Sequence, residues 1–382
     1  MDTQPLYDLA PVLQLMLLGI AVALGPLAWV WLRNKQAAPA QRLAALTVLT
    51  LFLTFDLVLF GAFTRLTDSG LGCPDWPGCY GNASPSGAHA EISQAQAQMP
   101  TGPVTHGKAW IEMVHRYLAT GVGVLILTLA VATWMQRKRG VPVSPWWPAL
   151  TLVWVCLQGA FGALTVTMKL FPAIVTLHLL GGMLGLALLC LQAVAYAQAQ
   201  RGTGPQLLPG NQRAALLAAF GLLWLQIALG GWVSTNYAVL ACSDFPACQG
   251  AWWPAMDFRQ GFELWRELGK AGSGEHVTFA ALTAIHYSHR LVAYVLFAAL
   301  LALAWRLWRG PLHRQARWLA GLALWQFASG LSNVVLGWPL VAAVAHTAGA
   351  AGLVIVFTWA VCESRATPVR AGERVRRREV SA

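Results

Sequence analysis

The sequence predicts an all-α membrane protein that crosses the bilayer several times. Of its 382 residues, 57% are hydrophobic and only 11% are charged, and the mean hydropathy is +0.54. Soluble domains are usually about 45–50% apolar and about 25% charged, so this chain has too few charges to coat a water-exposed surface. The apolar residues also fall in runs of membrane-spanning length, since a helix needs roughly 20 residues to cross about 30 Å of hydrocarbon.

Nine such runs follow one another along the chain. Backbone polar groups in lipid must be satisfied within their own segment, which makes helices the expected structure. The sequence does not show the short alternating segments of a membrane β-barrel. The predicted spans are Pro11–Leu32, Leu43–Thr64, Lys108–Trp134, Trp147–Met168, Pro172–Ala197, Arg213–Thr235, Thr278–Trp305, Arg317–Gly337 and Leu340–Val361.

The distribution of basic residues predicts the orientation. The connections after the first, third, fifth and seventh spans, together with the C-terminal tail, hold 18 of the 26 Lys and Arg residues. The positive-inside rule places these segments in the cytoplasm and the N-terminus outside. The net charge of +11 therefore reflects topology and contact with anionic lipid, and it does not indicate binding of nucleic acid.

Four of the seven cysteines form two pairs in long loops that this topology places outside. An oxidising exterior favours disulfides, and prolines within each short separation make closure feasible. Metal binding is the alternative, although no further thiol or His stands at zinc-site spacing. We expect the disulfides Cys73–Cys79 and Cys242–Cys248.

The two cysteine loops are copies within an internal duplication. The stretch GAFTRLTDSGLGCPDWPGCYG (61–81) aligns without gaps on GGWVSTNYAVLACSDFPACQG (230–250), at a constant offset of 169. Later matches keep the same order: VHRYLA with SHRLVA, Gln158 and Gly162 with Gln326 and Gly330, and His178 with His346. Such regular self-similarity indicates a repeated structural unit.

Each copy contains four spans, an even number, so both copies insert the same way up. We therefore predict two tandem parallel four-helix bundles, residues 43–200 and 201–364. An extra N-terminal helix with a basic loop (1–42) precedes them, and a basic tail (365–382) follows.

Histidines occur at matched positions inside the spans of both copies. Each copy has one in its second helix and one in its fourth, and an ionisable side chain within a span is a functional candidate. Two imidazoles facing each other across a bundle form the axial ligand set of a heme iron. A proton relay or hydrogen-bonded structural histidines are the alternatives, but neither requires pairs at equal depth. The predicted ligand pairs are His115 with His178 and His289 with His346.

Arg116 and Arg290 directly follow the first histidine of each pair. A guanidinium group suits a carboxylate, so these arginines are candidates for binding heme propionates. Extension of the side chain to lipid headgroups is the alternative.

The copies differ three residues before that histidine, where Glu112 stands in the first copy and His286 in the second. A carboxylate beside one heme pocket only favours proton chemistry in the N-terminal half, and an electron-transfer or structural heme in the other. A local ion pair between Glu112 and Lys108 is the alternative. We expect His286 to pack or form a hydrogen bond rather than bind iron.

Together these features resemble the heme A synthase family of cytochrome oxidase assembly. The resemblance covers about Leu43 to Cys362 and rests on TRLTDSGLGCPDWPGCYG, EMVHR, NYAVLACSDFPACQG, the HR pair at 289–290, and the histidines at 178 and 346. It implies an oxidoreductase that oxidises the C8 methyl group of heme O to the formyl group of heme A for cytochrome c oxidase. The family pattern has eight spans, so Pro11–Leu32 is an addition.

The resemblance also implies roles for individual residues. The substrate heme would lie in the N-terminal bundle between His115 and His178, and a permanent heme B in the C-terminal bundle between His289 and His346. Glu112 would be the essential acidic residue, and Cys73–Cys79 a redox-linked disulfide. The implied location is a bacterial-type inner membrane, with heme O synthase or oxidase assembly factors as partners.

Two other functions fit the residues. One is a di-heme b-type membrane electron-transfer protein linked to quinol, which predicts equivalent heme sites and no need for Glu112. The other is a heme-handling assembly scaffold that carries out no chemistry on heme.

Overall fold

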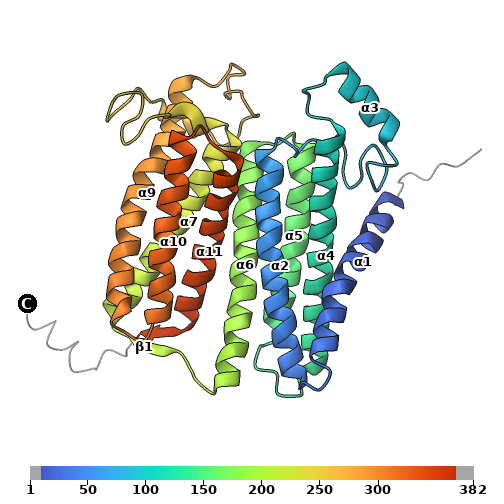
Figure 1. The fold of residues 1–382 in the computed structure, drawn as a ribbon, viewed down its shortest axis with the longest axis vertical. Coiled ribbons are helices and arrows are strands. Elements are labelled where there is room, and N and C mark those ends of the chain that lie inside the picture. The colour runs from blue at the N-terminus through green and yellow to red at the C-terminus, as the bar shows by residue number, and fades with distance from the viewer. Residues whose placement is uncertain (1–9, 367–382) are drawn as a thin grey trace, which may run out of the picture.

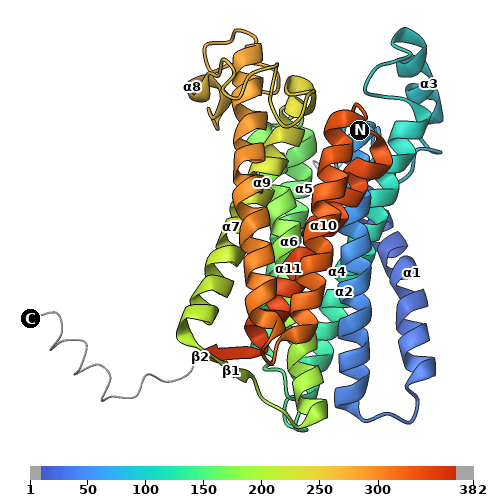
Figure 2. The same cartoon turned by 60° about the vertical axis from the view of Figure 1, so that its left-hand side comes forward.

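Long helices standing side by side make up the fold. A computed structural model describes residues 10–366, and Figures 1 and 2 show these helices running between two ends where the loops gather. The long helices are α1 (Ala10–Arg33), α2 (Pro39–Leu66), α4 (His106–Gln136), α5 (Trp146–Thr167), α6 (Pro172–Arg201), α7 (Gly210–Thr235), α9 (Phe279–Trp308), α10 (His313–Val335) and α11 (Leu340–Cys362).

Short elements lie in the connections. Helix α3 (His89–Gln98) belongs to the first cysteine loop region, and the 3-10 helix η1 (Ala238–Ala241) and α8 (Phe258–Gly261) to the second. At the opposite end, strand β1 (Gln206–Leu208) pairs in parallel with β2 (Ser364–Ala366). We call the two ends the cysteine-loop end and the basic end.

The prediction of an all-α polytopic membrane protein is confirmed. Among the described residues, eight helices are long and apolar enough to cross a membrane. The ninth predicted span, Arg317–Gly337, coincides with α10, which packs against α9 and α11. This helix is less apolar, with His313, Arg314 and Arg317 in its first turns and Gln326 and Asn333 further along. The count of nine crossings therefore stays a prediction.

Local sequence signals explain where several helices begin and end. Pro39 and Pro172 occupy the first turns of α2 and α6, where a missing N–H costs nothing. The Thr105 side chain accepts a hydrogen bond from the backbone N–H of Lys108 and so caps α4. Helix α6 ends at Gly202, whose φ of +63° suits glycine.

The four long helices of each sequence repeat contact one another in a ring. In the first repeat α2 touches α4 and α6, and α5 closes the ring; in the second, α7 touches α9 and α11, and α10 closes it. This contact pattern is the one expected for two four-helix bundles. The domain boundaries themselves stay predictions, and residues 1–9 of the N-terminal segment and 367–382 of the basic tail lie outside the described residues.

The two rings share an apolar interface. Helix α6 packs against α7 and α11, and α2 also touches α11. The largest core cluster joins Met183 and Leu186 of α6 to buried residues of α7, α9, α10 and α11. At the cysteine-loop end, the Arg65 guanidinium donates to the carbonyl of Ser234 at 2.7 Å. These two residues occupy equivalent repeat positions, so the two halves meet here at matching points of the repeat.

Helix α1 packs on the outside of the first ring, mainly against α4. The helices approach closely because a glycine lies on each side of the contact. A Cβ on Gly19 would lie 2.3 Å from Cγ2 of Thr120, and one on Gly121 would lie 2.9 Å from Cγ1 of Val22. The extra N-terminal helix is therefore an integral part of the packed structure.

Candidate heme site

The paired histidines of the first repeat each rest against a glycine of a neighbouring helix. His115 on α4 faces Gly61 on α2, where an added Cβ would lie 3.0 Å from its Cε1 atom. His178 on α6 faces Gly162 on α5, with the corresponding distance at 3.7 Å. Both imidazoles therefore point into the ring of helices.

The second repeat has the same arrangement. An added Cβ on Gly230 of α7 would lie 2.9 Å from Cε1 of His289 on α9. One on Gly330 of α10 would lie 3.2 Å from Cε1 of His346 on α11. The duplication thus extends to the small residues that make room for the rings.

The two imidazoles of each pair lie within electrostatic range of each other, His115 of His178 and His289 of His346. All four side chains are only half-buried, although they point inward. The rings are therefore not fully enclosed by packed side chains.

The donor set fits a heme iron. Among residues 10–366, no cluster of three or more His, Cys, Asp and Glu could hold a metal ion through protein ligands alone. Two imidazoles suffice when a porphyrin supplies the remaining four nitrogens. The buried Nδ1 atoms of His115 and His178 make no hydrogen bond within the described residues, so no protein contact competes for these atoms.

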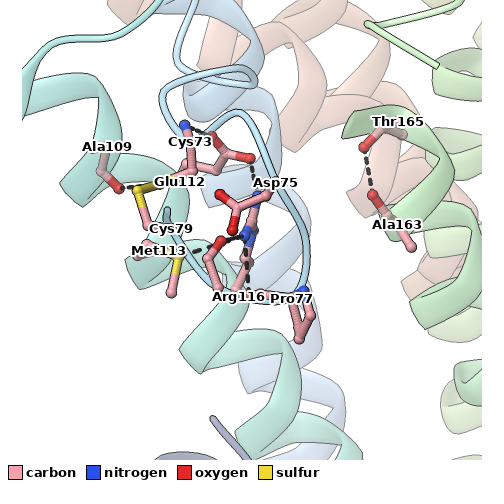
Figure 3. A network of polar contacts seen from close by, with 12 residues as sticks. Cys73, Asp75, Pro77, Cys79, Ala109, Glu112, Met113, Arg116, Ala163 and Thr165 are labelled. Atoms are coloured by element: carbon pink, nitrogen blue, oxygen red, sulfur yellow. Dashed lines mark hydrogen bonds and ion pairs between the residues drawn. A yellow bond between two sulfur atoms is a disulfide. The ribbon is translucent and has the colours of Figure 1, made fainter. Parts of the chain in front are cut away.

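Glu112 is buried beneath the first cysteine loop, as Figure 3 shows. Its Oε2 atom accepts a hydrogen bond from the backbone N–H of Cys73 at 2.8 Å, and its Oε1 atom lies 2.5 Å from the guanidinium of Arg116. Its side chain is only 5% exposed. The alternative pairing with Lys108 is wrong, because that ammonium group donates to the carbonyl of Gly102 at 3.1 Å.

Arg116 and Arg290 hold the cysteine loops. The Arg116 guanidinium donates to the carbonyls of Pro77 and Gly78 at 3.0 and 2.5 Å. Arg290 donates to the carbonyls of Ala247 and Asp244 at 2.6 and 2.9 Å. Both arginines are buried, so the alternative that they extend to lipid headgroups is wrong. Propionate binding stays a prediction, and the loop carbonyls already engage these donors.

Both predicted disulfides, Cys73–Cys79 and Cys242–Cys248, are present. Within the first loop, the Asp75 carboxylate accepts hydrogen bonds from the backbone N–H groups of Tyr80 and Gly81 at 2.6 and 2.7 Å. Asp244 makes the equivalent two contacts in the second loop. The two loops are therefore copies in structure as well as in sequence.

His286 takes the place of Glu112 in the second repeat. It is buried, and its Nδ1 atom lies 3.0 Å from the carbonyl oxygen of Ala238. The expectation that His286 forms a hydrogen bond is confirmed. The second repeat thus has an imidazole at the position where the first repeat has the buried carboxylate of Glu112.

Comparison with known proteins agrees with this geometry. The family model described as "Cytochrome oxidase assembly protein" matches residues 44–358, most of the chain. The chain belongs to this family. Relatives named heme A synthase match over most of their length. The one from Shewanella oneidensis is 37% identical over 316 residues, which is 82% of this chain and 94% of the relative.

More distant relatives carry the same name. The heme A synthase of Hyphomonas neptunium is 28% identical over 360 residues, 89% of this chain and 93% of its own. That of Halalkalibacterium halodurans is 26% identical over 297 residues, with shares of 76% and 86%. The predicted resemblance to the heme A synthase family is confirmed.

The sequence alone did not reveal the residues that contact the histidines. The four glycines were visible as matched positions of the repeat, but their contact with imidazoles was not. Gln226 and Ser329 lie beside His289 and His346. The available signal was that the two repeats differ at these positions, as they do at Glu112.

Proposed function

We propose that this protein is a heme A synthase, which oxidises the C8 methyl group of heme O to the formyl group of heme A. Family membership and the names of the relatives support the assignment. The observation that carries it is the pair of inward-facing imidazoles in each half, with the buried carboxylate of Glu112 in the first half at the position where the second half has His286. A protein that only passes electrons between two hemes has no need of this carboxylate.

In the proposed arrangement, His115 and His178 hold the substrate heme, and His289 and His346 hold a resident heme B. Heme iron supplies the oxidation and electron-transfer chemistry that amino-acid side chains lack. Conversion of a methyl group to an aldehyde removes four electrons from heme O. The side chains of the chain orient the two hemes and move protons.

Glu112 is the proposed proton-handling group. It lies three residues before His115 on α4, so both side chains lie on the same face of the helix. Positioned carboxyl groups that transfer protons contribute roughly 10²–10⁴-fold to a reaction rate. The hydrogen bond from Cys73 N–H also joins Glu112 to the disulfide loop. Reduction of Cys73–Cys79 would loosen that loop and move a group that positions the carboxylate, which is the proposed basis of the redox link.

Pigment extraction from the full-length protein, produced together with a source of heme O, tests this proposal. We expect heme A and heme O beside heme B. Glu112→Gln should keep both hemes bound but lower the yield of heme A by about 100-fold. Glu91→Gln removes an exposed carboxylate of α3 and is the matched control, with an unchanged yield.

Three results would contradict the proposal or part of it. Extraction of heme B alone would favour the electron-transfer protein, and normal conversion by Glu112→Gln would remove the catalytic role of Glu112. Heme O bound without any conversion would favour the heme-handling scaffold.

A further inference from the structure

The two halves differ in what lies beside the Nδ1 atoms of the paired histidines. In the C-terminal half, the amide nitrogen of Gln226 lies 3.0 Å from Nδ1 of His289, and Oγ of Ser329 lies 3.0 Å from Nδ1 of His346. In the N-terminal half, the Nδ1 atoms of both histidines are buried and lack a hydrogen bond among residues 10–366.

The cause of this difference can be read from the repeat. Gln226 lies at the repeat position of Leu57, at the offset that relates Gly230 to Gly61. Ser329 lies at the repeat position of Phe161, beside the matched pair Gly330 and Gly162. Leu and Phe side chains offer an imidazole neither a donor nor an acceptor.

The contacts of Ser329 show the direction of its hydrogen bond. A serine hydroxyl has a single proton, and that of Ser329 is donated to the carbonyl of Trp325 at 2.7 Å. With its proton placed there, the Ser329 oxygen is free to accept an Nδ1 proton from His346 at 3.0 Å, and in that tautomer the Nε2 lone pair of the ring is available to a metal. Gln326 also lies beside His346, but the first repeat has Gln158 at that position, so Ser329 is the sequence difference at this ring.

Gln226 carries an unused acceptor next to His289. Its amide nitrogen donates to the backbone carbonyl of His289 at 3.1 Å, while its Oε1 atom is buried and has no partner within the described residues. The amide nitrogen also lies 3.3 Å from Nε2 of His289, so a change of the Gln226 rotamer, rather than a turn of the amide in place, would bring this oxygen to Nδ1. An iron-bound imidazole needs an acceptor at that atom.

Hydrogen bonds of this kind change how strongly an imidazole binds a metal. An acceptor at Nδ1–H fixes the tautomer and the ring orientation and raises the basicity of the ligating nitrogen. Loss of such a partner typically lowers metal affinity by about 10–100-fold. The basicity of the ligating nitrogen also changes the reduction potential of a heme, because a more basic ligand stabilises the oxidised iron.

We propose that Gln226 and Ser329 are positioning residues that make His289 and His346 a permanent ligand pair. Leu57 and Phe161 leave His115 and His178 as weaker ligands, from which a heme is released more readily. This inference rests on the proposed function and deepens it, since a substrate heme must be exchanged in every reaction cycle and a resident heme B must stay.

Heme transfer from the full-length protein to apomyoglobin tests the proposal. A His115→Ala background isolates the C-terminal heme, and a His289→Ala background isolates the N-terminal heme. We expect the N-terminal heme to leave at least about tenfold faster. In the first background, Gln226→Met and Ser329→Val should each speed heme loss by about tenfold and raise the reduction potential of the heme.

Matched variants separate this role from a merely structural one. Thr has the shape of Val but keeps the hydroxyl, so Ser329→Thr should retain the parent rate and the parent potential. In the second background, Leu57→Gln should slow heme loss and lower the potential. This variant also tests the role of position 226 if Gln226→Met fails to fold.

Equal rates and potentials for Ser329→Thr and Ser329→Val, or no effect of Leu57→Gln, would overturn the inference and leave the proposed function intact. If His289→Ala leaves the heme spectrum of the C-terminal half unchanged, the assignment of His289 as an iron ligand is wrong, and the inference is wrong with it.

Discussion

Glycine and histidine act as a unit at each of the four proposed ligand positions. The imidazole lies where a side chain of the neighbouring helix would otherwise be, so the helix contact and the ring orientation depend on each other. The distances are shorter than ordinary carbon contacts at Gly230 and Gly61, where an added Cβ would lie 2.9 and 3.0 Å from the ring. Glycine at these positions therefore leaves space for the imidazole ring; it is not there to make the helix flexible.

Gly230→Ala should displace the ring of His289 and weaken heme binding in the C-terminal half. Overpacking of this kind costs about 1–3 kcal/mol, and we expect a loss of heme affinity of about tenfold. Gly221→Ala in the same helix is the control, because nothing lies within 4 Å of its added Cβ. Heme titration of both variants measures the difference, and equal affinities would show that the glycine contact does not position the ring.

At the scale of elements, each cysteine loop is fastened to the helices by the same set of groups. A disulfide closes the loop, an aspartate binds two of its backbone N–H groups, and a buried arginine binds its carbonyls. The first loop adds a contact to Glu112, which the second lacks. One loop design therefore supports two different sites.

The Asp244 turn should make the stability of the second loop depend on pH. The backbone N–H groups of Gly250 and Gln249 hold the pKa of Asp244 below its ordinary value of 3.8. The ionised Asp244 carboxylate therefore contributes fully to the stability of the loop above about pH 4. This contribution is lost as the pH falls through the lowered pKa. Reduction of Cys242–Cys248 by a phosphine should speed up in that acid range.

Asp244→Asn is the reference for this experiment, since its side chain cannot titrate. In this variant the rate of disulfide reduction should stay constant between about pH 2.5 and 5. The parent protein should be reduced more slowly than the variant at about pH 5 and at nearly the same rate at about pH 2.5. Parallel profiles for the two proteins would show that the Asp244 contacts do not stabilise the loop.

At the scale of the whole molecule, a duplicated unit has diverged into two halves that differ at a few positions beside the histidines. The helices of both repeats form similar rings, and the shared apolar interface through α6, α7 and α11 holds the rings together. The proposed sites then differ through single residues, including Glu112 against His286 and Leu57 against Gln226. Under the proposed function, divergence after duplication would give one substrate site and one resident site within a single chain.

The uneven distribution of basic residues predicts that the cysteine-loop end faces the outside of the cell. Ser273 lies exposed in a connection at that end, and Ser144 lies exposed at the basic end. In intact cells, an impermeant maleimide should label Ser273→Cys, and it should label Ser144→Cys only after the membrane is permeabilised. The opposite pattern would reverse the proposed topology.

The sequence was sufficient for the features that repeat. Hydropathy located the helices, and the alignment of the two copies located the histidines, the disulfides and the difference at Glu112. The ion-pair partner of Glu112 was harder to predict, because helical spacing places both Lys108 and Arg116 one turn from it. Only the loop conformation decides that Arg116 approaches it. The polar neighbours of His289 and His346 come from other helices, so spacing within one helix could not reveal them.

The claim on which the account depends is that each histidine pair holds its own heme iron. Heme content and absorption spectra of the full-length protein, compared with the double variants His115→Ala/His178→Ala and His289→Ala/His346→Ala, test it most directly. We predict two bound hemes in the parent protein and the loss of a different one in each variant. Retention of both hemes in either double variant would contradict the account.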